Sequence, residues 1–245
     1  MSTLFASPLS RISRVFPSQA SSFLPTRLLH TFRFALLVGA TYYAGTLVGF
    51  AWTPSGQPNS TFWPPNAILL TCFLLAPTRI WWTFILAVFP AHMLAQHQAG
   101  VPLWTAVGWF ISNISEALIS AFCITRLTES RKIFDDLRGV FTFLIFAVVI
   151  APFATSFLDV FAVVITGWGR HYWPLGIERF FTNALAVLAI VPTIMLFRVN
   201  GLSWIRRLTV ARFCEVVLLA LGTGRAVRDG DGAVLPMPQP RGLIP

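Results

Sequence analysis

Long apolar blocks follow one another along this chain, with very few charges between them. From Phe34 to Ser115 the only formally charged side chain is that of Arg79. A bilayer core is about 30 Å thick and needs about 20 apolar residues per helix, with every backbone group hydrogen-bonded inside the segment. The pattern therefore predicts an all-α fold, a polytopic transmembrane helical bundle with about six spans plus a truncated seventh.

We expect the six spans at blocks that are almost free of charge. They lie near residues 34–52, 62–78, 80–96, 104–125, 139–166 and 174–197. The fifth block contains Pro152, which lacks a backbone donor and predicts a kink. We interpret this block as one kinked span, because its first part, residues 139–151, is too short to cross a bilayer alone.

The basic residues separate the two sides of the predicted bundle. The N-terminal tail, Arg79, the polar connector 126–138 and the residues after 197 all carry arginine, whereas the loops on the opposite side, 53–61 and 97–103, carry no basic residue. Cytoplasmic loops are enriched in Lys and Arg. The N-terminus is therefore expected in the cytoplasm. Dividing the fifth block into two spans would place several arginines on the outer side of the membrane, which is a second reason to interpret it as one span.

Outside the membrane domain, expected over residues 34–222, the composition changes at both ends. Residues 1–33 are rich in serine and arginine, which is typical of a transit peptide or of a cytoplasmic basic tail, and we favour the tail. Residues 223–245 are rich in Gly, Pro and Arg, and we expect them to be disordered. The apolar run 213–222 contains Glu215 and has about half the length of a span. We interpret it as a truncated seventh span, for which a frameshift is one explanation.

Composition supports the membrane interpretation and narrows the function. The 245 residues are 56% hydrophobic and 11% charged, with a mean hydropathy of +0.71 and a net charge of +9. A basic balance can indicate nucleic acid, but here the basic residues lie between apolar blocks, so the expected partner is the lipid bilayer and not nucleic acid. The chain carries no catalytic triad, phosphate loop or HExxH motif, so we expect no catalytic residue, no metal and no cofactor. The three cysteines stand alone in apolar surroundings and favour simple packing.

Ionisable and amide side chains inside the predicted spans are the candidate functional residues, since such groups are costly in lipid. They are Asn113, Glu116, Asp159, Arg179 and Asn183. Asn113 and Glu116 are three residues apart on one helical face, so we expect the amide to hydrogen-bond the carboxyl group. We also expect Glu116 or Asp159 to pair with Arg179. Three roles fit this cluster: a structural clasp, a ligand-recognition site, or a proton or ion relay.

Other polar residues fall near the ends of the predicted spans. His92 and His97 are five residues apart at the outer end of the third block, and His171 lies at another outer edge. Anchoring at the membrane interface is favoured over metal ligation for these histidines. Glu178, next to Arg179, can equally lie near the interface.

The second block opens with a distinctive turn. Pro64 and Pro65 follow Trp63 and precede Asn66. Proline disfavours helical geometry in the preceding residue, and tryptophan is common at the level of the lipid headgroups. We interpret the turn as an interface anchor and helix start, with a ligand-facing turn as the alternative.

Five segments together resemble a known family. They are FWPPNAILLTCFLLAPTRIWW (62–82), FPAHMLAQ (89–96), WFISNISEALISAFCITRL (109–127), IAPFATSFLDV (150–160) and WGRHYWPLGIERFFTNALAVLAIVP (168–192). In this order they resemble the first type of membrane-associated sensor domain (MASE), an input module of bacterial histidine kinases and diguanylate cyclases. The resemblance covers about residues 34–222 and implies a location in the bacterial inner membrane.

Carried over residue by residue, the resemblance marks a set of positions in the membrane. They are Trp63, Pro64, Pro65, Asn113, Glu116, Arg179, Asn183 and Pro192. The last helix differs from the commoner family pattern, which has a Gly-Asp pair near Arg179 and Asn183. Family members usually have eight spans, and the signatures of an output domain do not occur in this sequence.

Two functions fit these observations best, and a purely structural or assembly subunit of the membrane is a third possibility without a distinguishing feature. The first is a sensory input module without catalytic activity of its own, responding to an unknown small molecule or membrane stimulus. The kinase and cyclase outputs of such proteins commonly work as dimers, so a homodimer is an expected partner. The alternative is a small transporter or channel, with Glu116, Asp159 and Arg179 lining the path. Paired repeats with broken helices are typical of transporters, and the two halves of this chain show no convincing repeat.

Overall fold

The computed structural model describes four stretches of the chain: residues 23–54, 60–128, 133–167 and 172–200. The tail expected to be disordered and the apolar run expected to be a truncated span lie outside these residues, as do most of the basic N-terminal tail and His171.

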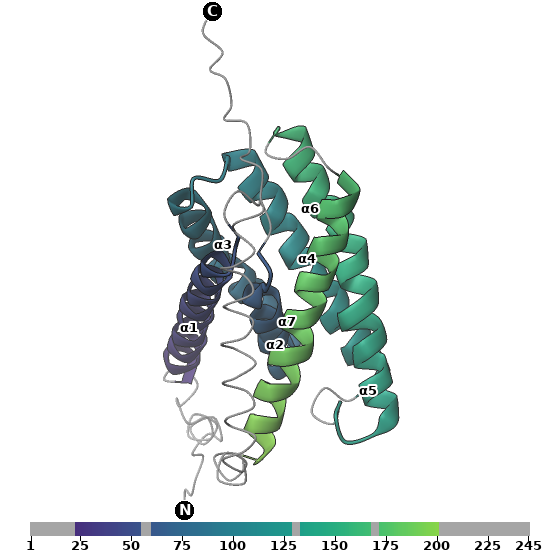
Figure 1. The fold of residues 1–245 in the computed structure, drawn as a ribbon. Coiled ribbons are helices and arrows are strands. Elements are labelled where there is room, and N and C mark those ends of the chain that lie inside the picture. Colours follow the sequence, from purple (N-terminus) through teal and green to yellow (C-terminus); the bar gives the residue numbers. More distant parts are fainter. Residues whose placement is uncertain (1–22, 55–59, 129–132, 168–171, 201–245) are drawn as a thin grey trace, which may run out of the picture.

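The described residues form helices joined by short connections, and no strand occurs among them. In chain order they are α1 (Phe23–Ala51), α2 (Pro64–Leu75), the 3-10 turn η2 (Thr78–Ile80), α3 (Trp81–Gln98), α4 (Leu103–Leu127), α5 (Leu137–Phe143), the π-helical segment η3 (Leu144–Ile150), α6 (Ala151–Ile165) and α7 (Tyr172–Asn200). Figure 1 shows them side by side in one bundle. The expected all-α bundle is confirmed.

Within the described part of the chain, four helices are long and apolar enough to cross a membrane. They are Thr31–Ala51, Leu103–Leu127, Leu137–Ile165 and Tyr172–Arg198. The second predicted block differs from them, because its helix α2 has only 12 residues and a length of about 18 Å. α3 has 18 residues and ends in polar side chains. All six blocks are therefore helical, but two of them are shorter than the others.

The fifth block forms one continuous helix of 29 residues from Leu137 to Ile165, as the single-span interpretation predicts. Its irregularity is a π-helical segment, in which the N–H of Ala151 donates to the carbonyl oxygen of Phe146, five residues earlier. Pro152, which has no N–H to donate, follows directly. A wider hydrogen-bond pattern beside a proline gives the neighbouring carbonyl groups other donors, so the helix continues through this point.

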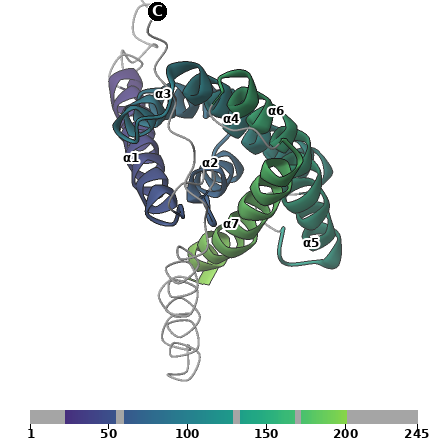
Figure 2. The same ribbon diagram turned by 45° about the horizontal axis from the view of Figure 1, so that its top comes forward.

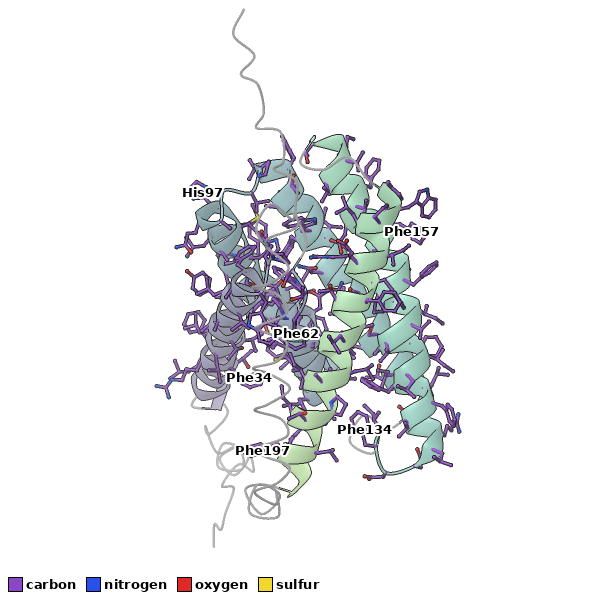
Figure 3. All side chains as sticks on the ribbon, in the orientation of Figure 1. Phe34, Phe62, His97, Phe134, Phe157 and Phe197 are labelled. Carbon is purple, nitrogen blue, oxygen red and sulfur yellow. The ribbon has the colours of Figure 1, made fainter. Side chains whose placement is uncertain are left out.

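The outer surface of the bundle is apolar. Large side chains such as Leu86, Phe153 and Phe181 are 62%, 56% and 63% exposed, and Figure 3 shows aromatic side chains projecting from the outer faces of the helices. A protein in water rarely exposes apolar surface on this scale. The polar side chains described below are instead buried between the helices, which is the distribution that lipid requires.

The short helix α2 lies at the centre of the bundle. It packs against α1, α4 and α7, and Figure 2 shows it enclosed by α1, α3, α4 and α7. Small residues allow close packing elsewhere: a Cβ atom at Gly108 on α4 would collide with the Cβ atom of Ala162 on α6. Small residues at helix contacts are typical of membrane bundles, because they let backbones approach.

Replacing Gly108 with alanine should destabilise the bundle, although alanine is the better helix former. The added methyl group overlaps Ala162, and overpacking of this kind costs about 1–3 kcal/mol. The matched control is Gly176→Ala on α7, where the nearest atom to a new Cβ is 3.7 Å away and helix propensity favours alanine by about 1 kcal/mol. Thermal unfolding in detergent measures both. Equal stability of the two variants would contradict the close α4–α6 contact.

Candidate functional site

The entry to α2 brings the Trp63 turn into the interior of the bundle. The Ser60 hydroxyl donates to the carbonyl oxygen of Gly49 at 2.7 Å, and the N–H of Thr61 donates to the carbonyl of Trp52 at 3.0 Å, so this segment is tied to the end of α1. Trp63 then packs on Gly49, where a Cβ atom would lie 2.5 Å from its ring, and is only 2% exposed. The helix start is where the sequence predicts it, but the anchor at the membrane interface is wrong, because Trp63 is buried.

Two prolines suit the buried start of α2. The first N–H groups of a helix have no partner within it, and here no side chain caps them. Pro64 and Pro65 occupy the first two helical positions and have no N–H group. They reduce the number of backbone donors that need a partner inside the protein, which explains how a helix can begin in the bundle. Asn66 follows at once and is 1% exposed.

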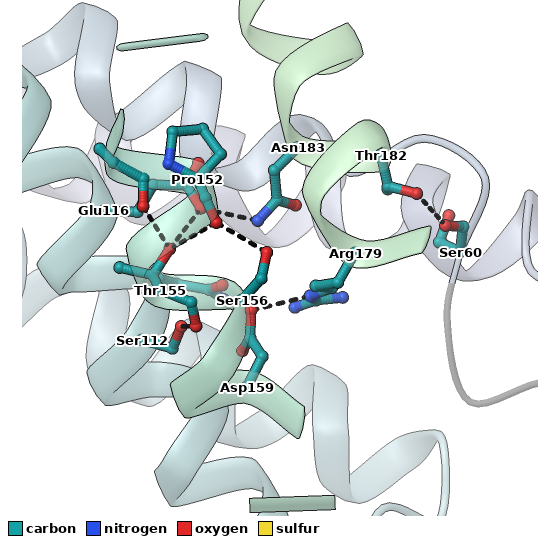
Figure 4. A network of polar contacts seen from close by, with 12 residues as sticks. Ser60, Ser112, Glu116, Pro152, Thr155, Ser156, Asp159, Arg179, Thr182 and Asn183 are labelled. Carbon is teal, nitrogen blue, oxygen red and sulfur yellow. Dashed lines mark hydrogen bonds and ion pairs between the residues drawn. The ribbon is translucent and has the colours of Figure 1, made fainter. Parts of the chain in front are cut away.

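Arg179 of α7 forms the central ion pair of the site. Its Nε atom donates to the Oδ2 atom of Asp159 on α6 at 2.9 Å, and both side chains are 2% exposed (Figure 4). Its guanidinium carbon lies 5.1 Å from the ring centroid of Trp63 and 5.3 Å from that of Trp109. Both distances fall in the range of cation–π contacts, which are stronger where water is excluded. The predicted pairing of a buried carboxylate with Arg179 is confirmed for Asp159.

Glu116 lies near the midpoint of α4 and joins that helix to α6 and α7. Its Oε2 atom accepts a hydrogen bond from the Nδ2 atom of Asn183 at 2.6 Å and lies 3.1 Å from the Thr155 hydroxyl (Figure 4). The Asn66 amide lies beside the same carboxyl group without forming a hydrogen bond of normal geometry. Helices α2, α4, α6 and α7 thus each contribute to the surroundings of Glu116.

The expected hydrogen bond between Asn113 and Glu116 is wrong. Asn113 instead donates through Nδ2 to the hydroxyl oxygen of Tyr42 on α1 at 3.2 Å. The Tyr42 hydroxyl lies 3.2 Å from Nδ1 of His92, whose Nε2 lies 3.0 Å from the carbonyl oxygen of Ala106. A carbonyl only accepts, so Nε2 carries the proton and Tyr42 donates to Nδ1. Residues three apart on a helix share a face, but Asn113 and Glu116 contact different neighbouring helices and form their hydrogen bonds with those helices.

The structure also shows whether His92, His97 and Glu178 are buried or exposed. His92 is fully buried, so the expected interfacial role is wrong for it, because its two ring nitrogens link α1 to α4 inside the bundle. His97 is exposed at the end of α3, as Figure 3 shows. Glu178 lies on the exposed side of α7, one residue from buried Arg179.

Sequence reasoning missed three contributors to the site: Trp109, Tyr42 and Thr155. Trp109 had a usable signal, because it lies four residues before Asn113 and therefore on the same helical face. The other two had none. A tyrosine or threonine within an apolar block is common, and only the packing of α1 and α6 shows what these hydroxyl groups meet.

Several buried polar atoms of this site have no hydrogen-bond partner. They are Trp63 Nε1, both polar atoms of the Asn66 amide, Trp109 Nε1, Asn113 Oδ1, Glu116 Oε1, Asp159 Oδ1, Arg179 Nη2 and Asn183 Oδ1. Buried polar groups are nearly always paired in native proteins, with protein, water or a bound ion. The site therefore has spare capacity for hydrogen bonding. Within the described ranges, no three His, Cys, Asp or Glu side chains are grouped to hold a metal ion.

These features define an integral membrane protein of the multi-pass helical type, with an ionisable cluster buried between its helices. The model of the MASE1 family matches residues 34–225, which is most of the chain. The protein belongs to this family, a membrane-associated sensor domain found in signalling proteins. No curated protein matches the chain. No solved structure matches it either.

The ion pair gives a direct test of the site. Arg179→Ala should cost about 3–5 kcal/mol of stability, because it leaves the buried Asp159 carboxylate without its partner. The double variant Asp159→Asn, Arg179→Met removes both charges and should recover most of this loss. Chemical unfolding in detergent measures both. Arg138→Ala, at an exposed position, is the control and should change stability by less than about 0.5 kcal/mol. A double variant less stable than Arg179→Ala would contradict the pairing.

Proposed function

We propose that this chain is the sensory input module of a bacterial signalling protein and that its buried polar cluster is the sensing element. The cluster consists of Asn113, Glu116, Asp159, Arg179 and Asn183. Its output would be a histidine kinase or diguanylate cyclase domain outside these 245 residues, so the chain alone would have no catalytic activity. The expected location is the inner membrane, with the N-terminus in the cytoplasm.

One observation carries this proposal: α7 is joined to two other helices through buried ionisable groups. Arg179 binds Asp159 on α6, and Asn183, one turn further along α7, binds Glu116 on α4. A stimulus that alters either carboxyl group changes a contact of α7. α7 has a further buried polar contact, because the Thr182 hydroxyl donates to the carbonyl oxygen of Ser60 at 2.9 Å (Figure 4), so directional hydrogen bonds hold this helix at several points.

The proposed output is a shift of α7, whose C-terminal end lies at the same end of the bundle as α5 (Figure 1). Helix displacements of about 1–2 Å are common in allosteric transitions. The helix that carries Asp159 also contains the π-helical segment η3, and π-helical segments are often found at functional sites. The cluster thus lies between α7 and the helix that contains this irregular segment, so a change in its contacts can move either helix.

A chimera tests the function. It joins a diguanylate cyclase domain to the C-terminal end of the full chain, and cellular cyclic di-GMP is measured. Glu116→Gln and Arg179→Lys should each change the output by about five-fold or more, the lower end of typical coupling energies. Ile111→Ala is the matched control, because the Ile111 side chain on α4 is 51% exposed, and it should leave the output unchanged.

Equal output from the cluster variants and the control, at equal protein levels, would contradict the sensor proposal. The rival function, a transporter or channel, has one supporting feature in the helix α2 that begins inside the bundle, since broken helices are typical of transporters. Reconstituted protein that carries solute or ion flux across liposomes, with loss of the flux in Glu116→Gln, would favour the rival.

The orientation has its own test. Reporter fusions after residues 57, 100 and 170 should behave as exported, and fusions after 130 and 205 as retained in the cytoplasm. The physical reason is the asymmetry of basic residues between the two sides. Alkaline phosphatase and fluorescent protein reporters measure the two states in the same set of fusions. A reversal at any position would contradict the proposed topology.

A further inference from the structure

The charges around Glu116 do not balance. The ionisable groups that face it are Tyr42 from α1, Asp159 from α6 and Arg179 from α7, while His92 from α3 reaches the site through Tyr42. α2 contributes the neutral amide of Asn66. Two carboxyl groups therefore share one guanidinium group, and that group is already bonded to Asp159. An ionised Glu116 would leave one negative charge uncompensated near the middle of the membrane, which is costly.

Unpartnered polar atoms occur in the side chains next to the same carboxyl group. Glu116 Oε1 has no partner, and neither do the side-chain oxygens of Asn66 beside it and of Asn183 bonded to it. Asn66 is only 1% exposed, and neither polar atom of its amide is paired. Amide groups can present either oxygen or nitrogen to a ligand. Carboxylate and amide oxygens are the ligands that hard cations prefer.

We propose that Glu116, with the amides of Asn66 and Asn183, binds a monovalent cation that balances the charge of this cluster. The cation is an alkali metal ion or a proton, since both supply the single positive charge that the site lacks. An alkali metal ion would use the unpartnered amide oxygens as further ligands, and for Asn183 this requires the amide to turn its oxygen toward the carboxyl group (Figure 4). A proton would make Glu116 a neutral donor.

The bound cation also gives the cluster two states. With the cation present, the Glu116 carboxyl group is neutralised and stays between Asn183 and Thr155. Without it, the carboxylate competes with Asp159 for the guanidinium group of Arg179. The signalling consequence of this switch rests on the proposed function, but binding of the cation does not, so the two can fail separately.

The test is the thermal stability of the purified full chain in detergent, with NaCl exchanged for choline chloride at constant ionic strength, at pH values from 5.5 to 8.5. A ligand that binds only the folded state raises Tm, and saturating occupancy should raise it by about 5 °C in a protein of this size. A rise with Na+ at fixed pH identifies the alkali metal ion. A rise as pH falls, without an effect of Na+, identifies the proton.

Two variants make the test specific. Glu116→Gln keeps the size of the side chain and removes the charge, so it should lose both dependences. Glu178→Gln makes the same change at an exposed position of α7 and should keep them. A wild-type Tm that is independent of both Na+ and pH, or a Glu116→Gln variant that keeps the full dependence, would overturn the proposal.

If Glu116→Gln fails to fold, the wild-type protein still decides the question. Infrared difference spectra between choline and sodium buffers, and between high and low pH, report whether a buried carboxyl group changes its state. A change in the carboxylate or carboxylic acid bands supports the site, and identical spectra overturn it. A cation effect on stability combined with an unresponsive cyclase chimera would leave the binding site in place and reject the sensor function.

Discussion

The ion pair between Arg179 and Asp159 is the interaction on which the rest of this site depends. In a bundle surrounded by lipid, a lone guanidinium or carboxylate group is not solvated by water. The cost of burying each charge is offset only because the opposite charge lies beside it. The pair fixes α6 against α7, and the indole rings of Trp63 and Trp109 complete the surroundings of the cation. This contact also constrains α2 and α4, since Trp63, directly before α2, and Trp109 of α4 both lie against the same guanidinium group.

This arrangement also explains the unusual entry of the chain into the bundle. Trp63 reaches Arg179 because the chain turns inward after α1 instead of starting a new helix at the membrane surface. The helix that follows is short, central and surrounded by others. A buried helix start would normally leave several N–H groups without partners. The consecutive prolines remove two of them, and Gly49 makes room for the indole ring.

Much of this structure could be predicted from apolar block lengths and charge placement. The single fifth helix followed from arithmetic on span length, and the pairing of a carboxylate with Arg179 followed from the cost of charge in lipid. The partners of Asn113 and His92 could not be predicted in this way, because they depend on how α1 and α3 rotate about their axes. Trp63 was misplaced for a related reason: tryptophan beside a helix start usually marks the headgroup region, and only the inward turn of the chain reveals its burial.

The π-helical segment η3 joins α5 to α6 and therefore determines how these two parts of the fifth helix can move relative to each other. A π-helical stretch holds more residues per turn than the α-helix around it, so it stores surplus length within one otherwise continuous rod. Converting this segment to α-helical hydrogen bonding would change both the rotation and the distance between α5 and α6, because each α-helical residue contributes about 100° of rotation and about 1.5 Å of length. The half of the helix that contains Asp159 would then keep its position, while the half that follows the connector rotates about the helix axis.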